Sequence, residues 1–279
     1  MSGVRWAIAA SLATAATHAA MRGVELHPFL VAFWRNALCL ALVLPAAVWW
    51  RSWTNLPGAL PRHSLRGLVN AAARGLLIAG LGRLPFTEAT ALTFATPVFV
   101  LIGGMVFLKE RPGPAAALSA ALGFAGVLII APPGPGWRSS GGALVLASAV
   151  FFAASMLIGR SQTRYADNLS ILFYLYLMLT LFTAPLAATE WQWPDGTAFA
   201  GLAAVALCGV VAHFCAIIAL RRAEAARIAP FDYLRLVWAA IIGLALFGEP
   251  PSARALTGGA LITAAALLAL HRGPLRRAS

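Results

Sequence analysis

Long apolar runs separated by short polar turns organise the whole chain. The runs fall at about residues 4–21, 28–50, 65–82, 86–108, 114–131, 142–160, 169–188, 198–220, 227–248 and 253–271. A helix needs about 20 mostly apolar residues to cross the ~30 Å of bilayer hydrocarbon. The breaks carry turn residues, as in "NLPGALP", "APPGPGWRSSGG" and "GEPPS". The pattern therefore predicts an all-α integral membrane protein with ten transmembrane helices.

The first run, "RWAIAASLATAATHAAM", has features of a secretory signal, with Arg5 ahead of it and small residues behind. Because many similar runs follow, we expect an uncleaved first span rather than a removed leader.

Composition excludes an ordinary soluble domain. Hydrophobic residues make up 61% of the chain and charged residues 11%, and the mean hydropathy is +0.81, whereas soluble domains are about 45–50% apolar and about 25% charged. Cys39, Cys208 and Cys215 lie within apolar runs without the spacing of a zinc or redox site. We therefore expect no metal site and no cofactor.

The formal net charge of +12 takes its meaning from where the basic residues lie. If both termini are cytoplasmic, fourteen basic residues fall on the cytoplasmic side and four on the outer side, namely Arg22, Arg83, Arg138 and Arg254. The positive-inside rule favours this orientation in a bacterial-type inner (plasma) membrane. The spread of charge along a membrane face also excludes nucleic acid as a partner, and leaves the lipid bilayer and a small-molecule substrate.

The two halves of the chain share a weak sequence repeat. "FLKERPG" at 107–113 is matched by "LFGEPPS" at 246–252, with Glu249 lying 139 residues after Glu110, and Gly243 lying 139 residues after Gly104. An odd number of spans separates the copies, so a repeated five-helix unit must insert upside down. Inverted repeats are the usual build of secondary transporters, with the substrate site near the bilayer midplane. We place the repeats at 1–138 and 139–279.

The chain resembles the EamA-type members of the drug/metabolite transporter superfamily over nearly its whole length. The stretch that begins "RLPFTEATALTFATPVF" at Arg83 resembles the family's first-repeat pattern, and "ALRRAEAARIAPFDYLRL" at Ala219 resembles the second. Arg35 in "AFWRNALCLAL" matches an arginine common in the family's second span, whereas Thr17 and His18 stand where many relatives have a Trp-Gly pair. The resemblance implies two inverted five-helix repeats around a central cavity and export of small metabolites, with amino acids, including aromatic ones, prominent among the cargoes.

Charged residues inside the spans are the main candidates for function. Asp232 and Arg235 share one helix face at i and i+3. Intramembrane charges usually mark a substrate or proton path, although a structural ion pair is the competing interpretation. With Arg35 and Arg74 also inside spans, the surplus of positive charge favours a substrate with a carboxylate or other anionic group. Snorkelling is the alternative for Arg35 and Arg74.

Aromatic and other polar residues complete the predicted substrate site. Small-molecule sites commonly have aromatic walls with a few polar groups, although aromatic residues also fill helix interfaces. The predicted substrate-binding set is therefore Arg35, Arg74, Phe94, Tyr174, His213, Asp232, Tyr233, Arg235 and Trp238. Pro97 interrupts the fourth span and is the predicted hinge. Proton coupling through Asp232, Glu88 or His213 and uncoupled facilitated diffusion both fit the few acidic groups.

The sequence thus predicts a secondary transporter that exports a small metabolite by alternating access. Amino acids, including aromatic ones, are the leading cargo. The alternatives are export of a vitamin, nucleoside or cationic compound, and a non-transporting membrane protein. No P-loop or hydrolase signature occurs, so an enzyme is not expected. The oligomeric state stays open.

Overall fold

The computed structural model describes residues 2–21, 24–52, 60–83 and 86–271, and within these ranges the chain forms helices and no strand. The elements, in chain order, are α1 (Ser2–Ala20), α2 (Pro28–Trp49), α3 (Leu60–Leu81), α4 (Phe86–Thr93), α5 (Thr96–Phe107), α6 (Pro114–Ile130), η2 (Pro135–Arg138), α7 (Ser140–Gln162), α8 (Asn168–Ala188), α9 (Gly196–Arg222), α10 (Ala225–Ile228), η3 (Ala229–Tyr233), α11 (Leu234–Phe247) and α12 (Ala253–His271).

These helices coincide with the ten predicted spans to within a few residues. Among the residues that the structure describes, five segments are long and apolar enough to cross a membrane by themselves: α2, α7, α8, α9 and the stretch Ala225–Phe247. Shorter apolar helices occupy Ala91–Phe107, Pro114–Ile130 and Ala253–Ala269. The predicted fourth and ninth spans are each broken, into α4 and α5 and into α10, η3 and α11.

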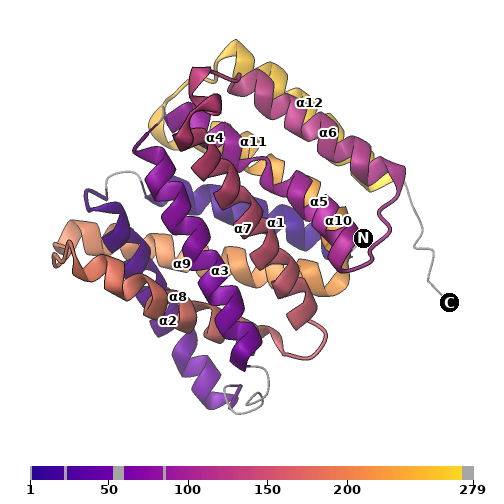
Figure 1. The fold of residues 1–279 in the computed structure, drawn as a ribbon. Coiled ribbons are helices and arrows are strands. Elements are labelled where there is room, and N and C mark those ends of the chain that lie inside the picture. Colours follow the sequence, from indigo (N-terminus) through magenta and orange to yellow (C-terminus); the bar gives the residue numbers. More distant parts are fainter. Residues whose placement is uncertain (1, 22–23, 53–59, 84–85, 272–279) are drawn as a thin grey trace.

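Helices of the first half of the chain pack mainly against helices of the second half. Helix α1 lies along α9, and α7 lies along α3 in the same way. Helices α6 and α12 lie side by side at one end of the molecule, and α2 and α8 at the other (Figure 1). Helices α2 and α8 are counterparts in the two halves, as are α6 and α12, and the pairing of α1 with α9 corresponds to the pairing of α7 with α3, which is the arrangement that two inverted repeats produce. The predicted fold class is confirmed, and the exact boundary at residue 138 stays a prediction.

The break in the fourth span follows from Pro97. A proline has no backbone N–H and clashes with the preceding turn, so a helix rarely continues through it. Helix α4 accordingly ends at Thr93 and α5 begins at Thr96, where the Thr96 hydroxyl donates a hydrogen bond to the carbonyl of Thr93 at 2.7 Å. Pro230 lies at the matching break of the ninth span, inside the 3₁₀ turn η3. The apolar pattern of the sequence did not predict this second break.

The acidic residue of the "FLKERPG" segment, Glu110, has a structural role at the contact between the two halves. The buried carboxylate accepts hydrogen bonds from the backbone N–H groups of Ala225 and Ala226, each at 3.0 Å, and pairs with Arg160 at 3.3 Å. A helix N-terminus has unsatisfied N–H groups and a partial positive charge, so a carboxylate placed there stabilises it. Glu110 of the first half therefore caps α10 of the second half and ties the two halves together.

Candidate substrate site

One face of α1 packs into the interior of the helix bundle. Val4, Ala7 and Ser11 recur at helical spacing and are buried. His18 follows on this same face, yet its side chain is exposed. His18 lies within electrostatic range of Arg235, Arg35 and Arg74, which lie on α11, α2 and α3. This proximity is what associates the C-terminal part of α1 with the charged residues of the other three helices.

The ion pair predicted on the ninth span forms at this region. Arg235 Nη2 lies 3.5 Å from Asp232 Oδ2, and the side chains are 19% and 36% exposed, respectively. Both side chains of the pair therefore keep some accessible surface, while Arg235 Nε is buried without an acceptor among the described residues. The guanidinium carbon of Arg235 also lies 4.0 Å from the centre of the Phe94 ring, a cation–π contact that fixes where the charge sits.

Phe94 and Tyr233 form the support beneath Arg235. Their rings stack with centroids 6.3 Å apart and an interplanar angle of 26°, and both side chains are buried. The Tyr233 ring rests on Gly123 of α6 so closely that a Cβ atom there would lie 2.3 Å from a ring carbon. The two predicted aromatic contacts are thus buried, and the Phe94 ring, backed by Tyr233, supports the guanidinium of Arg235.

Arg74 is held by a chain of hydrogen bonds from α3 to α7. Its Nε donates to Asn70 Oδ1 at 3.1 Å, and Asn70 Nδ2 donates to Ser155 Oγ at 3.0 Å. Its guanidinium also lies 5.9 Å from the ring of Phe152. These contacts fix the stem of Arg74 and leave donors on its terminal nitrogens for another partner.

Arg35 is the second cation of this region without an acidic partner. Its Nη2 donates to Asn36 Oδ1 at 3.0 Å, while its Nε is buried without an acceptor in the described part of the chain. No carboxylate pairs with Arg35 or Arg74 among the described residues. Unpaired positive charge is costly at membrane depth, so an anionic or acceptor-rich guest is favoured there.

Trp238 closes the site between α11 and α1. Its indole N–H donates to Ser11 Oγ at 3.1 Å, and its ring is partly exposed. An indole held in this way offers a flat apolar surface beside the charges of Arg235 and Asp232.

The remaining predicted residues lie at the margins of this cluster or away from it. His213 Nδ1 is 2.8 Å from the hydroxyl of Tyr176, which joins α9 to α8. Tyr174 stacks on His63 at 4.7 Å, near the start of α3 and about 16 Å along that helix from Arg74. Glu88 lies against the loop after α6, where a Cβ on Gly134 would be 2.2 Å from its carboxylate.

Two contributors, Ser11 and Asn70, were not singled out from the sequence, whereas His18 was noted as a departure from the Trp-Gly pair of many relatives. Asn70 lies one helical turn before Arg74, and that i, i+4 spacing was the available signal. Ser11 had none, because its partner Trp238 is 227 residues away. No group of three or more His, Cys, Asp or Glu side chains suited to a metal occurs among the described residues.

Known proteins resemble this chain across its length. Residues 1–131 and 139–271 each match the EamA-like transporter family. A riboflavin transporter of Rhizobium johnstonii is 34% identical over 220 residues, covering 77% of this chain and 72% of the relative. An S-adenosylmethionine uptake transporter of Rickettsia felis is 27% identical over 274 residues, covering 97% and 93%. A solved crystal structure superposes with a TM-score of 0.84 at 19% identity, covering 96% of this chain and 97% of the other, and shows the same fold.

Proposed function

Because this chain belongs to the EamA-like transporter family and is a multi-pass membrane transporter, we propose that it carries a flat heteroaromatic metabolite with a polar tail, of the riboflavin type. The observation that carries the proposal is the partly exposed cationic centre: Arg35 and Arg74 have no carboxylate partner among the described residues, and, like Arg235, which is held over Phe94, they lie within electrostatic range of His18.

The chemistry of such a cargo matches these groups. The isoalloxazine ring of riboflavin carries two carbonyls and ring nitrogens as acceptors, and a guanidinium presents planar donors that match them. Trp238 and the face of His18 offer flat surfaces against which such a ring stacks. The riboflavin-transporter relative at 34% identity supports this class of cargo.

Amino acids, the cargo expected from the sequence, are the second candidate. The unpaired arginines favour a carboxylate, because guanidinium and carboxylate pair in bidentate geometry. The names of the relatives reported above point instead to riboflavin and S-adenosylmethionine. S-adenosylmethionine combines a heteroaromatic base with an amino-acid carboxylate, so both features of the centre fit that molecule.

We propose uptake rather than the export expected from the sequence, because the S-adenosylmethionine relative is named for uptake. The proposed location is a bacterial inner membrane with both termini in the cytoplasm. Of the three groups considered for proton coupling, Asp232 alone is paired with a cation of this site. We therefore assign any coupling to Asp232, and Pro97 remains the proposed hinge.

Flux into proteoliposomes tests the proposal. We expect wild-type protein to equilibrate radiolabelled riboflavin, and excess unlabelled riboflavin, but not phenylalanine, to compete. Arg74→Gln is expected to lower the flux at least tenfold, because a hydrogen bond to a charged group contributes about 1.5–3 kcal/mol. Arg254→Gln, at an exposed position in the first turn of α12, is the matched control. Saturable flux of phenylalanine with no riboflavin flux would overturn this assignment in favour of amino acids.

Counterflow across an imposed pH gradient tests the coupling separately. If Asp232 carries a proton, the gradient drives accumulation in the wild type, and Asp232→Asn exchanges cargo without accumulating it. Accumulation that persists in Asp232→Asn contradicts the role of this carboxylate and leaves the cargo assignment standing.

A further inference from the structure

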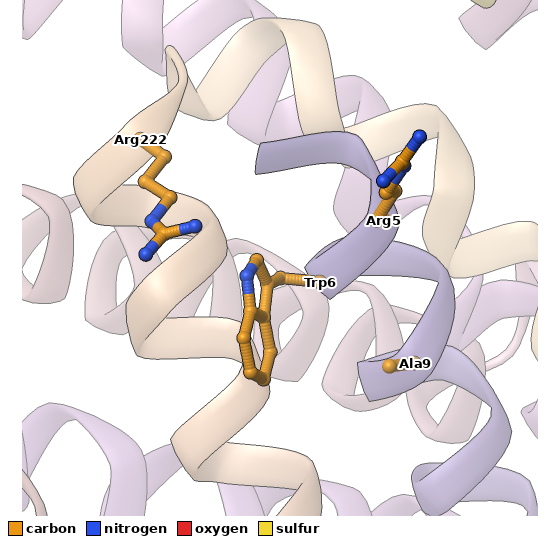
Figure 2. Close-up of a pocket in the computed structure, with 4 residues that line it drawn as sticks. All are labelled: Arg5, Trp6, Ala9 and Arg222. Carbon is orange, nitrogen blue, oxygen red and sulfur yellow. The ribbon is translucent and has the colours of Figure 1, made fainter. Parts of the chain in front are cut away.

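A groove lies on the outer surface of the bundle, where the start of α1 meets the end of α9. Its lining consists of Arg5, Trp6, Ala9 and Arg222, and its volume is about 420 Å³. Figure 2 shows Trp6 reaching from α1 toward Arg222 of α9, with Arg5 preceding it on the same helix. The groove therefore combines two guanidinium groups with one indole ring.

The groove faces away from the candidate substrate site. Arg5, Ala9 and Leu12 follow one another at helical spacing, on the side of α1 opposite Ser11 and His18. Leu12 is 43% exposed, as expected for a side chain in contact with lipid. The face with Arg5 is thus the lipid-facing side of α1.

Helix α9 shows the same arrangement. Leu207, Val211 and Phe214 are exposed large apolar side chains at helical spacing, and the exposed Arg221 and Arg222 follow about two turns later at the end of the helix, beyond the buried Ile218. An apolar stripe that ends in an arginine fits a phospholipid, with acyl chains along the stripe and the headgroup at its end.

The side chains of Arg222 and its neighbour Arg221 make different contacts within the protein. Arg221 donates to Asn168 Oδ1 at 2.7 Å and to the carbonyl of Ala166, so it serves to join α9 to the start of α8. Arg222 instead lies with its guanidinium 5.9 Å from the Trp6 ring, and neither it nor Arg5 pairs with a carboxylate in the described ranges. Both are exposed and available to an anion.

We propose that this groove binds the phosphate of an anionic phospholipid in the leaflet at the α1 N-terminus. The positive-inside distribution of arginines makes this the cytoplasmic leaflet. Basic pockets between transmembrane helices on that side are suited to anionic headgroups, and an indole at the same level is suited to the interface. Arg5 and Arg222 bind the phosphate from two helices, so the bound lipid bridges α1 and α9.

Native mass spectrometry of the purified full chain measures this binding. Phosphatidylglycerol is titrated onto wild type, Arg5→Gln, Arg222→Gln and the double variant. Each arginine near an anionic lipid is worth about 1 kcal/mol, so we expect about fivefold weaker retention per substitution and roughly 25-fold for the pair. Arg111→Gln, an exposed arginine on the same predicted membrane side, is the matched control and should retain the lipid like wild type.

Two further arms separate lipid binding from general charge effects. Phosphatidylcholine should be retained weakly and equally by all variants, and inorganic phosphate should not compete at concentrations matched to the lipid. Equal retention of phosphatidylglycerol by wild type and the double variant overturns the proposal, as does full competition by inorganic phosphate, which marks a free-anion site. Circular dichroism confirms that each variant keeps its helical content. None of these residues lies in the candidate substrate site, so failure here leaves the transport proposal untouched.

Discussion

The fourth and ninth spans are both interrupted at corresponding positions, but different side chains stand at the two breaks. Positions 139 residues apart correspond, so Phe94 matches its stacking partner Tyr233, and the break after Thr93 matches the turn η3. At the first break, Thr96 bonds to the carbonyl of Thr93. At the second break, the corresponding positions hold Arg235 and Asp232, which form an ion pair.

The contrast between threonines at the first break and charged residues at the second indicates why Asp232 and Arg235 are present. The first half makes its helix break with two neutral hydroxyl residues and a proline, so the fold itself does not require an ion pair at that place. Charges inside a membrane are costly, and a protein that could use threonine gains no stability from them. The asymmetry therefore supports a role for Arg235 and Asp232 in contacting cargo.

The helix ends that follow these breaks also correspond. Lys109 and Gly248 both adopt left-handed backbone conformations, with φ of 54° and 66°, and the next residues, Glu110 and Glu249, both donate their backbone N–H to a glycine carbonyl. The glutamate side chains differ, because Glu110 is buried and Glu249 is exposed. The repeat thus fixes the backbone of the turn and leaves the side-chain environment to the surrounding helices.

The largest expected effect separates these two glutamates. Glu110→Ala leaves Arg160 and two N–H groups of α10 without their buried partner, and we expect a loss of about 3–5 kcal/mol in the free energy of unfolding. Glu249→Ala removes an exposed carboxylate and should cost less than about 1 kcal/mol. Denaturation by titrated SDS, followed by circular dichroism, measures both. Equal losses would show that the two halves use their glutamates alike.

The next comparison sets Arg235 against its counterpart Thr96. Arg235→Gln removes the central charge, and we expect riboflavin to bind about 10- to 100-fold more weakly, because charged hydrogen bonds contribute about 1.5–3 kcal/mol. Thr96→Val removes only a local hydroxyl bond and should change the affinity less than threefold. Quenching of riboflavin fluorescence on titration with protein gives both affinities. A larger effect from Thr96→Val would reverse the assignment of function to the second half.

A smaller effect is expected within the aromatic stack. The Tyr233 hydroxyl is buried without a hydrogen-bond partner among the described residues, whereas its counterpart Phe94 has no hydroxyl. Tyr233→Phe should therefore keep or raise the free energy of unfolding, by up to about 1 kcal/mol. Thermal unfolding in detergent measures the change. A clear loss of stability would mean that the hydroxyl has a partner in the membrane-embedded protein.

The smallest effects concern the left-handed helix ends. Gly248→Ala forces a Cβ into a left-handed conformation and should cost about 1 kcal/mol. Lys109→Gly relieves that strain but adds freedom to the unfolded chain, so its net effect should stay within about 0.5 kcal/mol. The same SDS titration measures both variants, and a large loss in Lys109→Gly would contradict a left-handed backbone at Lys109 equivalent to that at Gly248.

The sequence by itself determined the ten spans, the pairing of two halves and the family, because apolar periodicity, prolines and short motifs are local properties of the chain. It also identified Asp232 and Arg235 as a pair, since both lie on one helix face. Only the tertiary structure decided that Phe94 and Tyr233 lie beneath Arg235, that Glu110 caps α10, and that Ser11 meets Trp238. These contacts join residues that are far apart in the chain, and side-chain pattern along one helix does not reveal which neighbour another helix will bring to it.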